Sequence, residues 1–208
     1  QASSLELAFI STPFDLDSVD FLDSIVDAIK IASGDNTFPQ LMARAAATDK
    51  PLILSTGLAG FDEIRAATEI IAGARKPPNN DINLALLHCV SSYPTQLTDA
   101  NVAVIPTLAR NFPDCVTGYS DHTIGINAVL AAVAAGARVI EKHFTIDNHY
   151  SDFRDHSLSA DPDTLKEMVE RIKEVSQLMG SGSLSLAECE RTGEQGFRRS
   201  AYAARKIE

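Results

Sequence analysis

The sequence lacks several features that mark specialised classes of protein. It has no Trp and only three Cys among 208 residues, and no apolar run reaches the roughly 18 residues that a membrane-spanning helix needs. The three cysteines, Cys89, Cys115 and Cys189, are odd in number and widely spaced. We therefore interpret them as small buried apolar residues in a reducing compartment, and expect a cytoplasmic protein with no membrane partner.

Basic residues are also in short supply. The chain carries 18 Lys and Arg against 28 Asp and Glu, which gives a net charge of −10 and a pI near 4.9. An acidic surface repels polyanions, so a nucleic acid is excluded as a partner. A ligand that carries phosphate would need local positive charge, because the overall field of the protein opposes it.

Six apolar runs rich in β-branched residues are each followed by a stretch of helical character. Strands that alternate with helices predict a parallel sheet in an α/β fold. Units of roughly 25 to 30 residues fit about six of the eight units of a (β/α)8 TIM barrel. No G-x-G-x-x-G follows any strand, so a dinucleotide-binding fold has no support. The predicted strands cover 7–12, 28–33, 51–56, 83–89, 115–120 and 138–144, and the predicted helices 17–25, 39–48, 61–73, 98–112, 125–137 and 160–180.

Polar side chains gather where each predicted strand ends. In a TIM barrel the catalytic groups come from the carboxyl ends of the strands and from the loops that follow them. All six strand ends carry such residues, which predicts a site at that face. The residues are Thr12, Lys30, Ser33, Ser55, His88, Tyr93, Ser120, His122, Glu141 and His143.

The stretch "GYSDHT", residues 118–123, resembles a hydrolytic triad written in one line. Side chains alternate along a strand, so Ser120 and His122 share a face while Asp121 points away. Three adjacent residues cannot form a Ser–His–Asp relay, and no G-x-S-x-G elbow is present. We therefore reject serine hydrolysis.

His122 and His143 are better interpreted as metal ligands. They end adjacent strands, so their imidazoles can converge over the barrel mouth. Two imidazoles completed by carboxylate, water or substrate oxygens suit Mn²⁺, Fe²⁺ or Zn²⁺ better than Mg²⁺. The alternative is that the two histidines bind substrate by hydrogen bonds without a metal.

Lysines raise a rival mechanism. A lysine at a strand end can form a Schiff base with a carbonyl substrate, and Lys30 is placed for it. Lys142 is not, because it faces the helices if Glu141 and His143 face inward. The "SGD" that follows Lys30 indicates anion binding instead, with Ser55 and Ser120 as further donors.

The ordered motifs "FISTPFD", "KIASGD", "LILSTG", "LLHCVSSYP", "GYSDHT", "VIEKHFT" and "DHSLSADPDTLKEMV" span nearly the whole chain. In that order they resemble the sialic acid synthase (N-acetylneuraminate synthase) family. The resemblance implies a TIM barrel that condenses phosphoenolpyruvate with an N-acetylmannosamine-like acetamido sugar. The products implied are a nine-carbon 2-keto sugar acid of the sialic acid type and phosphate.

The resemblance also implies residue roles. His122 and His143 would be catalytic metal ligands, for Mn²⁺ with Mg²⁺ or Co²⁺ as alternatives. Asp35 stands where many members have Glu, at a position proposed for proton handling, and Tyr93 and Asp155 would face the sugar. The stretch "NHYSDFRDHSLS" departs from the family's usual loop in length and content, which affects the alignment of Asp155. Phosphoenolpyruvate would be held by Thr12, Lys30, Ser33, Ser55 and Ser120.

The same resemblance sets the expected domain organisation. Residues 1–180 would form a partial TIM-barrel synthase domain, and 181–208 a linker towards a C-terminal antifreeze-like domain. We expect the chain to be a fragment that lacks the first two β/α units and that domain, holding most of the site but inactive alone, from a protein that is a homodimer at full length. The alternatives left open are a Schiff-base aldolase that uses Lys30 and a non-catalytic truncated barrel that acts as a binding or assembly module.

Overall fold

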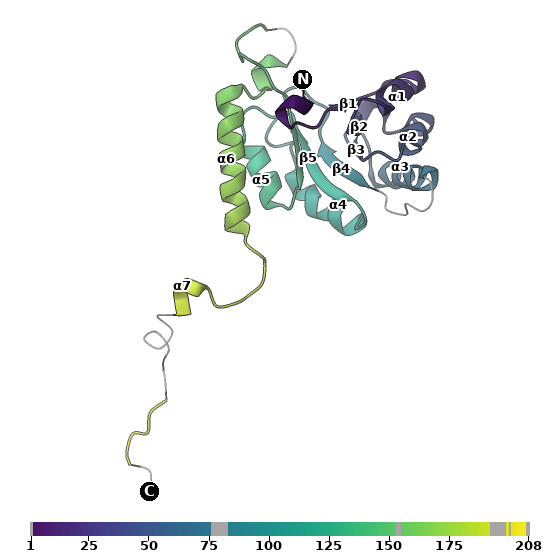
Figure 1. The fold of residues 1–208 in the computed structure, drawn as a ribbon. Coiled ribbons are helices and arrows are strands. Elements are labelled where there is room, and N and C mark those ends of the chain that lie inside the picture. The colour runs from purple at the N-terminus through teal and green to yellow at the C-terminus, as the bar shows by residue number, and fades with distance from the viewer. Residues whose placement is uncertain (1, 76–82, 153–154, 192–198, 200, 207–208) are drawn as a thin grey trace.

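The computed structural model describes residues 2–75, 83–152, 155–191, 199 and 201–206. Six strands form one parallel sheet in the order β1 to β6, so each strand pairs with its neighbours in the sequence (Figure 1). The strands are β1 (Ile10–Ser11), β2 (Ala28–Ile31), β3 (Leu52–Ser55), β4 (Leu84–Cys89), β5 (Val116–Asp121) and β6 (Val139–Lys142).

An α-helix follows every strand and lies outside the curled sheet (Figure 1). This arrangement confirms the six predicted β/α units. The helices are α1 (Leu16–Asp23), α2 (Pro39–Ala46), α3 (Phe61–Ala74), α4 (Ile105–Asn111), α5 (Asn127–Ala134), α6 (Pro162–Met179) and the short α7 (Glu188–Arg191). Single 3₁₀ turns occur at η1 (Ser3–Leu5), η2 (Ser33–Asp35), η3 (Val102–Val104) and η4 (His156–Leu158).

Most element boundaries differ from the predicted ones by a few residues, and two elements differ by more. The first predicted strand, 7–12, pairs as a strand only over Ile10–Ser11. The helix predicted over 98–112 begins later, because Asn101 takes a left-handed backbone conformation with φ 43° and a 3₁₀ turn follows it. The α-helix then starts at Ile105 with Pro106 in its first turn, where the missing N–H of proline costs nothing.

The main core lies between the outer face of the sheet and the helices. Ile29 and Ile31 on β2 are fully buried in this core, and so are Leu52 and Leu54 on β3. Because side chains alternate, the residues between and after them point to the inner face of the curl. Core packing thus directs polar residues of the same strands, such as Lys30, towards the inside.

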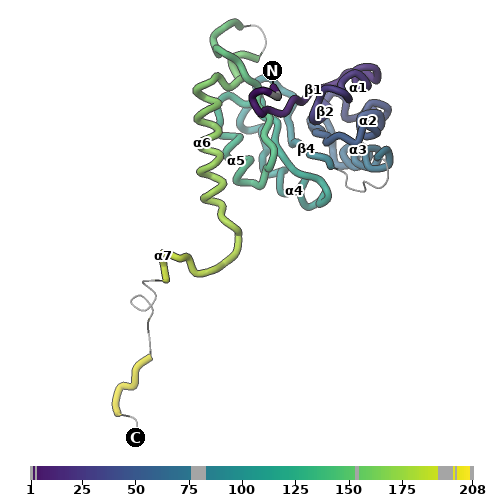
Figure 2. Tube along the Cα trace, viewed as in Figure 1, coloured from purple at the N-terminus to yellow at the C-terminus, as the bar shows by residue number. Residues whose placement is uncertain are grey.

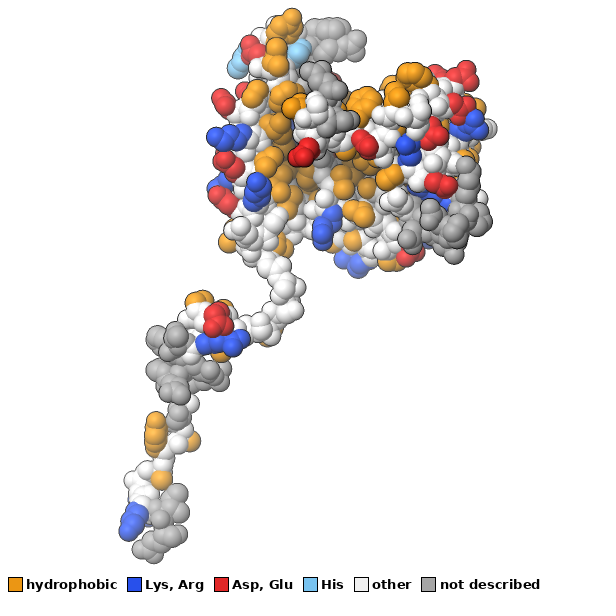
Figure 3. All heavy atoms as spheres, viewed as in Figure 1, with side chains coloured by type: hydrophobic (Ala, Val, Ile, Leu, Met, Phe, Trp, Pro, Cys, Tyr) orange, Lys and Arg blue, Asp and Glu red, His pale blue; other side chains and the backbone are white. Residues whose placement is uncertain are grey.

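Apolar side chains remain exposed at both edges of the sheet. Phe9 and Ile10 are each 44% exposed beside the β1 edge, and Phe144 is 55% exposed beside the β6 edge. Figure 3 shows apolar side chains gathered on the face between α6 and the helices α1 to α3. Such surface normally packs against further protein.

The segment after α6 leaves the sheet, and its described residues are exposed (Figure 2). The predicted linker, 181–208, falls partly outside the described residues; the part described contains α7. No helix formed by the described residues is long and apolar enough to cross a membrane.

Gly118 provides a test of how tightly β5 packs. A Cβ added there would overlap the backbone oxygen of Val139 on β6 and lie 2.5 Å from Leu87 Cδ2. We expect Gly118→Ala to lower the free energy of unfolding by about 1–3 kcal/mol, measured by urea denaturation. The control is Gly73→Ala in α3, which has no atom within 4 Å of the added Cβ and should stabilise by about 0.5–1 kcal/mol. Equal effects of the two changes would contradict this packing.

Candidate active site

A cavity of about 540 Å³ lies at the carboxyl ends of the strands. The residues that line it come from strands β2 to β6 and from the segments that follow β1 to β6. The structure therefore brings together most of the residues that the sequence predicted. Those that line the cavity are Thr12, Lys30, Ser33, Ser55, Tyr93, Ser120, His122, Glu141 and His143.

Two predicted site residues do not line the cavity. Asp155 lies at its margin, with Oδ2 3.6 Å from Nδ1 of His143. Asp35 is half-buried at the end of the η2 turn, two residues beyond Ser33. His88, one of the polar strand-end residues, turns to the helix side, where its Nε2 lies 2.8 Å from the backbone oxygen of Ala100.

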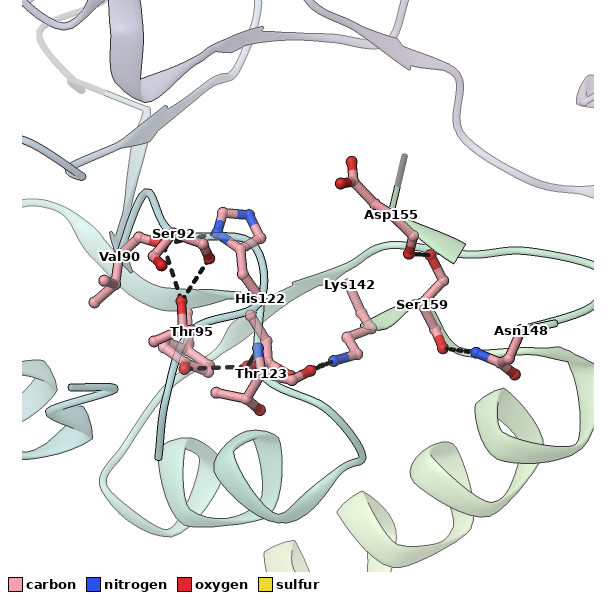
Figure 4. Close-up of polar contacts among 11 residues, drawn as sticks. Val90, Ser92, Thr95, His122, Thr123, Lys142, Asn148, Asp155 and Ser159 are labelled. Carbon is pink, nitrogen blue, oxygen red and sulfur yellow. Dashed lines mark hydrogen bonds and ion pairs between the residues drawn. The ribbon is translucent and has the colours of Figure 1, made fainter. Parts of the chain in front are cut away.

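The two histidines meet as predicted. Their ring centroids are 5.3 Å apart, and the ring of Tyr93 lies 4.1 Å from that of His122 and 5.7 Å from that of His143. His122 is held by its surroundings: Nδ1 donates to the carbonyl of Val90 at 2.8 Å, and its own carbonyl accepts from Thr95 N (Figure 4). With Nδ1 carrying the proton, the Nε2 lone pair of His122 is available to a ligand.

This donor pair fits a divalent metal ion with exchangeable partners. Imidazole nitrogens bind such ions at about 2.0–2.2 Å, so two rings at this separation can reach one ion. Burial and the neighbouring His122 both lower the pKa of His143, which keeps that imidazole in the neutral form that metals require. Across the ranges that the structure describes, no group of three or more His, Cys, Asp and Glu is arranged to hold a metal. Water or substrate oxygens would have to complete the coordination.

A group of hydroxyls and one ammonium forms a second feature of the cavity. The Lys30 side chain is 10% exposed, and the hydroxyls of Ser55 and Ser91 are buried without a hydrogen-bond partner. Ser33 Oγ accepts a hydrogen bond of 3.1 Å from Gly57 N. Buried polar groups normally have partners, so two unpaired hydroxyls beside a lysine indicate donors that await a ligand.

Glu141 ties this group to β5. Its carboxylate accepts a 2.6 Å hydrogen bond from Ser120 Oγ and lies 3.6 Å from Lys30 Nζ. Burial lowers the pKa of Lys30 while Glu141 opposes the shift, and the net pKa lies below the ordinary value. Ser120 bonds to Glu141 and not to His122, which agrees with the rejection of serine hydrolysis.

Among the cavity residues that were not predicted, Cys89 and Ser91 carry a thiol and a hydroxyl. Cys89 was interpreted as an apolar core residue; it is buried, but it lines the cavity with Sγ 3.9 Å from His122 Nδ1. Burial raises the pKa of the Cys89 thiol, but contacts with His122 and Ser33 outweigh that effect and lower it. The register that pairs Cys89 with the inward Ser120 is visible only in the structure, and Ser91 lies in a loop that has no strand periodicity.

The Asp121 carboxylate and the Lys142 amine lie on the opposite face of the sheet from this chemistry, as alternation predicted, although other atoms of Lys142 contribute to the cavity lining. Lys142 Nζ is 2.7 Å from Asp121 Oδ2, on the helix side of the sheet. This contact confirms that Asp121 points away from Ser120 and His122.

Residues 1–184 match the NeuB family, and the chain therefore belongs to that family. It is 46% identical to an uncharacterized protein of Methanocaldococcus jannaschii, over 99% of this chain and 59% of that protein. It is 39% identical to the N,N'-diacetyllegionaminic acid synthase of Campylobacter jejuni, over 99% of this chain and 60% of that enzyme.

Solved structures agree with this assignment. The crystal structure of N-acetylneuraminic acid (sialic acid) synthetase from Leptospira borgpetersenii, in complex with citrate, superposes with a TM-score of 0.86 at 35% identity. The match covers 94% of this chain and 66% of that one. This chain thus spans about three-fifths of the length of the curated relatives described above.

Gly57 tests whether the hydroxyl group binds an anion. A Cβ added at Gly57 would overlap Ser91 Oγ and lie 2.7 Å from Ser33 Oγ, so it would fill the space that a ligand oxygen needs. We expect Gly57→Ala to weaken the binding of inorganic phosphate by about tenfold or more, measured by calorimetry on the full-length protein. Gly73→Ala in α3 is the control, because nothing lies within 4 Å of its added Cβ and Gly73 does not line the cavity. Unchanged phosphate binding in Gly57→Ala would refute the assignment.

Proposed function

We propose that the whole protein condenses phosphoenolpyruvate with an N-acetylmannosamine-like acetamido sugar, giving a nine-carbon 2-keto sugar acid and phosphate. One observation carries the proposal: a buried lysine with unpaired hydroxyls and a pair of converging histidines share one cavity. An enzyme that joins an anionic enol phosphate to a neutral aldehyde needs both features side by side. Membership of the NeuB family, whose relatives include a legionaminic acid synthase, supports the same reaction.

The lysine and the hydroxyls would hold phosphoenolpyruvate. Lys30 supplies the local positive charge that an acidic protein needs in order to bind this anion. Ser55, with its unpaired buried hydroxyl, offers a donor that is already desolvated and oriented. Such preorganised donors lose little free energy on binding, which favours both affinity and positioning. Thr12, Ser33 and Ser120 complete the group.

The histidines would hold a divalent ion, which we take to be Mn²⁺ with Mg²⁺ or Co²⁺ as alternatives. When bound, such an ion acts as a Lewis acid that polarises the aldehyde of the open-chain sugar. Tyr93 is 53% exposed and packs against both imidazoles, so it can present an aromatic face to the sugar. Asp155, beside His143, can accept hydrogen bonds from the sugar hydroxyls.

The reaction then follows from the placement of the two substrates. C3 of phosphoenolpyruvate attacks the aldehyde carbon and forms the new C–C bond. The C=O π electrons move to the aldehyde oxygen, which takes up a proton and becomes a hydroxyl, while positive charge develops at C2. Water adds at C2 and loses a proton, and the tetrahedral intermediate expels phosphate by breaking its C2–O bond, which leaves the 2-keto acid. Asp35, in the turn after Lys30, would handle a proton in these steps. No Schiff base is required.

In the whole protein, we propose that residues 1–180 belong to an eight-unit TIM barrel and that 181–208 lead to an antifreeze-like domain. Two further β/α units between β6 and β1 would cover the exposed apolar side chains at both sheet edges. Closure would also remove the unpaired strand edges, which otherwise invite association. A homodimer and a cytoplasmic location remain part of this proposal.

A Schiff-base aldolase is the second candidate, and the lowered pKa of Lys30 favours it. Against it, the Lys30 amine donates to the carbonyl of Ile31 and lies near the Glu141 carboxylate. Both contacts stabilise the ammonium, which is not nucleophilic.

Phosphate release distinguishes the two candidates. We expect the full-length protein to release phosphate from phosphoenolpyruvate and N-acetylmannosamine, to lose this activity with EDTA and to regain it with Mn²⁺. His122→Ala should reduce the rate by at least about 100-fold, because it removes half of the protein's metal ligands.

Reductive trapping of a Schiff base at Lys30 tests the aldolase candidate. Borohydride added with pyruvate should leave the mass of the Lys30 peptide unchanged if no Schiff base forms. Release that resists chelation, together with a mass increase at Lys30, would reverse the order of the two candidates.

A further inference from the structure

A buried ion pair lies on the far side of the sheet from the two histidines. Lys142 Nζ and Asp121 Oδ2 are 2.7 Å apart, and the two side chains are 3% and 0% exposed. The residues are direct partners in the β5–β6 register. The pair therefore links the two strands that carry His122 and His143.

Each charged group has further partners. Asp121 Oδ1 accepts hydrogen bonds from Tyr119 OH at 3.1 Å and from Thr123 N at 2.9 Å. The Lys142 amine also donates to the carbonyl of Thr123, and Figure 4 shows it directed at that backbone. Residues 121–123, which include His122, are thus connected to Lys142 by two hydrogen bonds, one of which is also the ion pair with Asp121.

The ion pair lies at the ends of the two strands, directly beside both histidines in the sequence. β5 ends at Asp121 and β6 ends at Lys142, so His122 and His143 each lie one residue beyond the last paired position. The β5–β6 ladder stops short of both histidines, and their backbone carbonyls accept hydrogen bonds from Thr95 N and Ala160 N instead. The ion pair and the Lys142 hydrogen bond to the Thr123 carbonyl link the two strands at the positions that carry the imidazoles.

Stability alone is a poor reason for this pair. Its surroundings are apolar: Tyr119, Ala128, Ala132, Ala137 and Ile140 pack together on this side of the sheet. Buried ion pairs in such places can often be replaced by apolar residues without loss of stability, because the desolvation of both charges opposes their attraction. What apolar residues cannot supply is a directional link that sets the spacing of two strand ends.

We propose that Asp121 and Lys142 are positioning residues that hold His122 and His143 at the separation needed to share one divalent ion. The inference rests on the proposed function, because it assumes that the histidines bind a metal. It assigns a role to two residues whose charged groups bond to each other on the helix side of the sheet.

The test uses Co²⁺ as the probe, added to metal-free full-length protein. We expect Lys142→Met to lower Co²⁺ affinity by about 10–100-fold and to change the visible absorption of bound Co²⁺, which depends on ligand geometry. Asp121→Asn should do the same; it keeps an oxygen for Tyr119 and Thr123, so it carries the test if Lys142→Met does not fold.

The matched control separates positioning from general destabilisation. Leu41→Ala removes a fully buried side chain from α2, in the core cluster on the other side of the fold. It should lower the unfolding temperature while leaving Co²⁺ affinity and absorption as in the wild type. The exposed Arg44–Asp20 ion pair offers a second control, and Arg44→Met should alter neither property.

The Co²⁺ measurements distinguish failure of the positioning inference from failure of the metal site. If the wild type and both folded variants bind Co²⁺ equally tightly and with the same spectrum, the positioning inference is overturned and the metal site survives. If the wild type binds no Co²⁺, the proposed metal site fails, and the inference fails with it.

Discussion

Side-chain alternation along the parallel strands is the constraint on which the candidate site depends. Each strand buries one set of side chains beneath the helices, which leaves the other set for the inner face of the curled sheet. On β2 the buried Ile29 and Ile31 thereby direct Lys30 inward. On β5 the outward Tyr119 and Asp121 alternate with the inward Ser120. The apolar core and the polar cavity are therefore two consequences of one pattern.

The same constraint explains how an acidic chain can offer an anion site. With a net charge of −10, the protein as a whole repels phosphate esters, and Lys30 supplies positive charge inside the cavity. Burial of the lysine is stabilised by its amine, which donates a hydrogen bond to the Ile31 carbonyl and lies 3.6 Å from the Glu141 carboxylate. An incoming anion would find this amine already oriented, with desolvated hydroxyls beside it.

Much of this arrangement could be predicted from the sequence, because strand periodicity is local information. It predicted six β/α units, the inward Ser120 and the outward Asp121. It did not reveal Cys89 as a cavity residue, because a cysteine in an apolar run has the same signature whether it faces the core or the site. Strand periodicity could not predict loop geometry either. The unpaired Ser91 hydroxyl and the late start of α4 after Asn101 depend on loop backbone conformations, which leave no periodic pattern in the sequence. The metal, the substrates and the role of Asp35 stay predictions.

We propose that His122 and His143 hold one metal ion beside bound phosphoenolpyruvate. This claim is tested most directly by crystals of the full-length protein grown with Mn²⁺ and phosphoenolpyruvate, with diffraction data collected on both sides of the manganese absorption edge. We predict a single anomalous peak between the two imidazoles, with the phosphate of the ligand near Lys30 and Ser55. Phosphoenolpyruvate bound at that place with no anomalous peak between the histidines would contradict the claim.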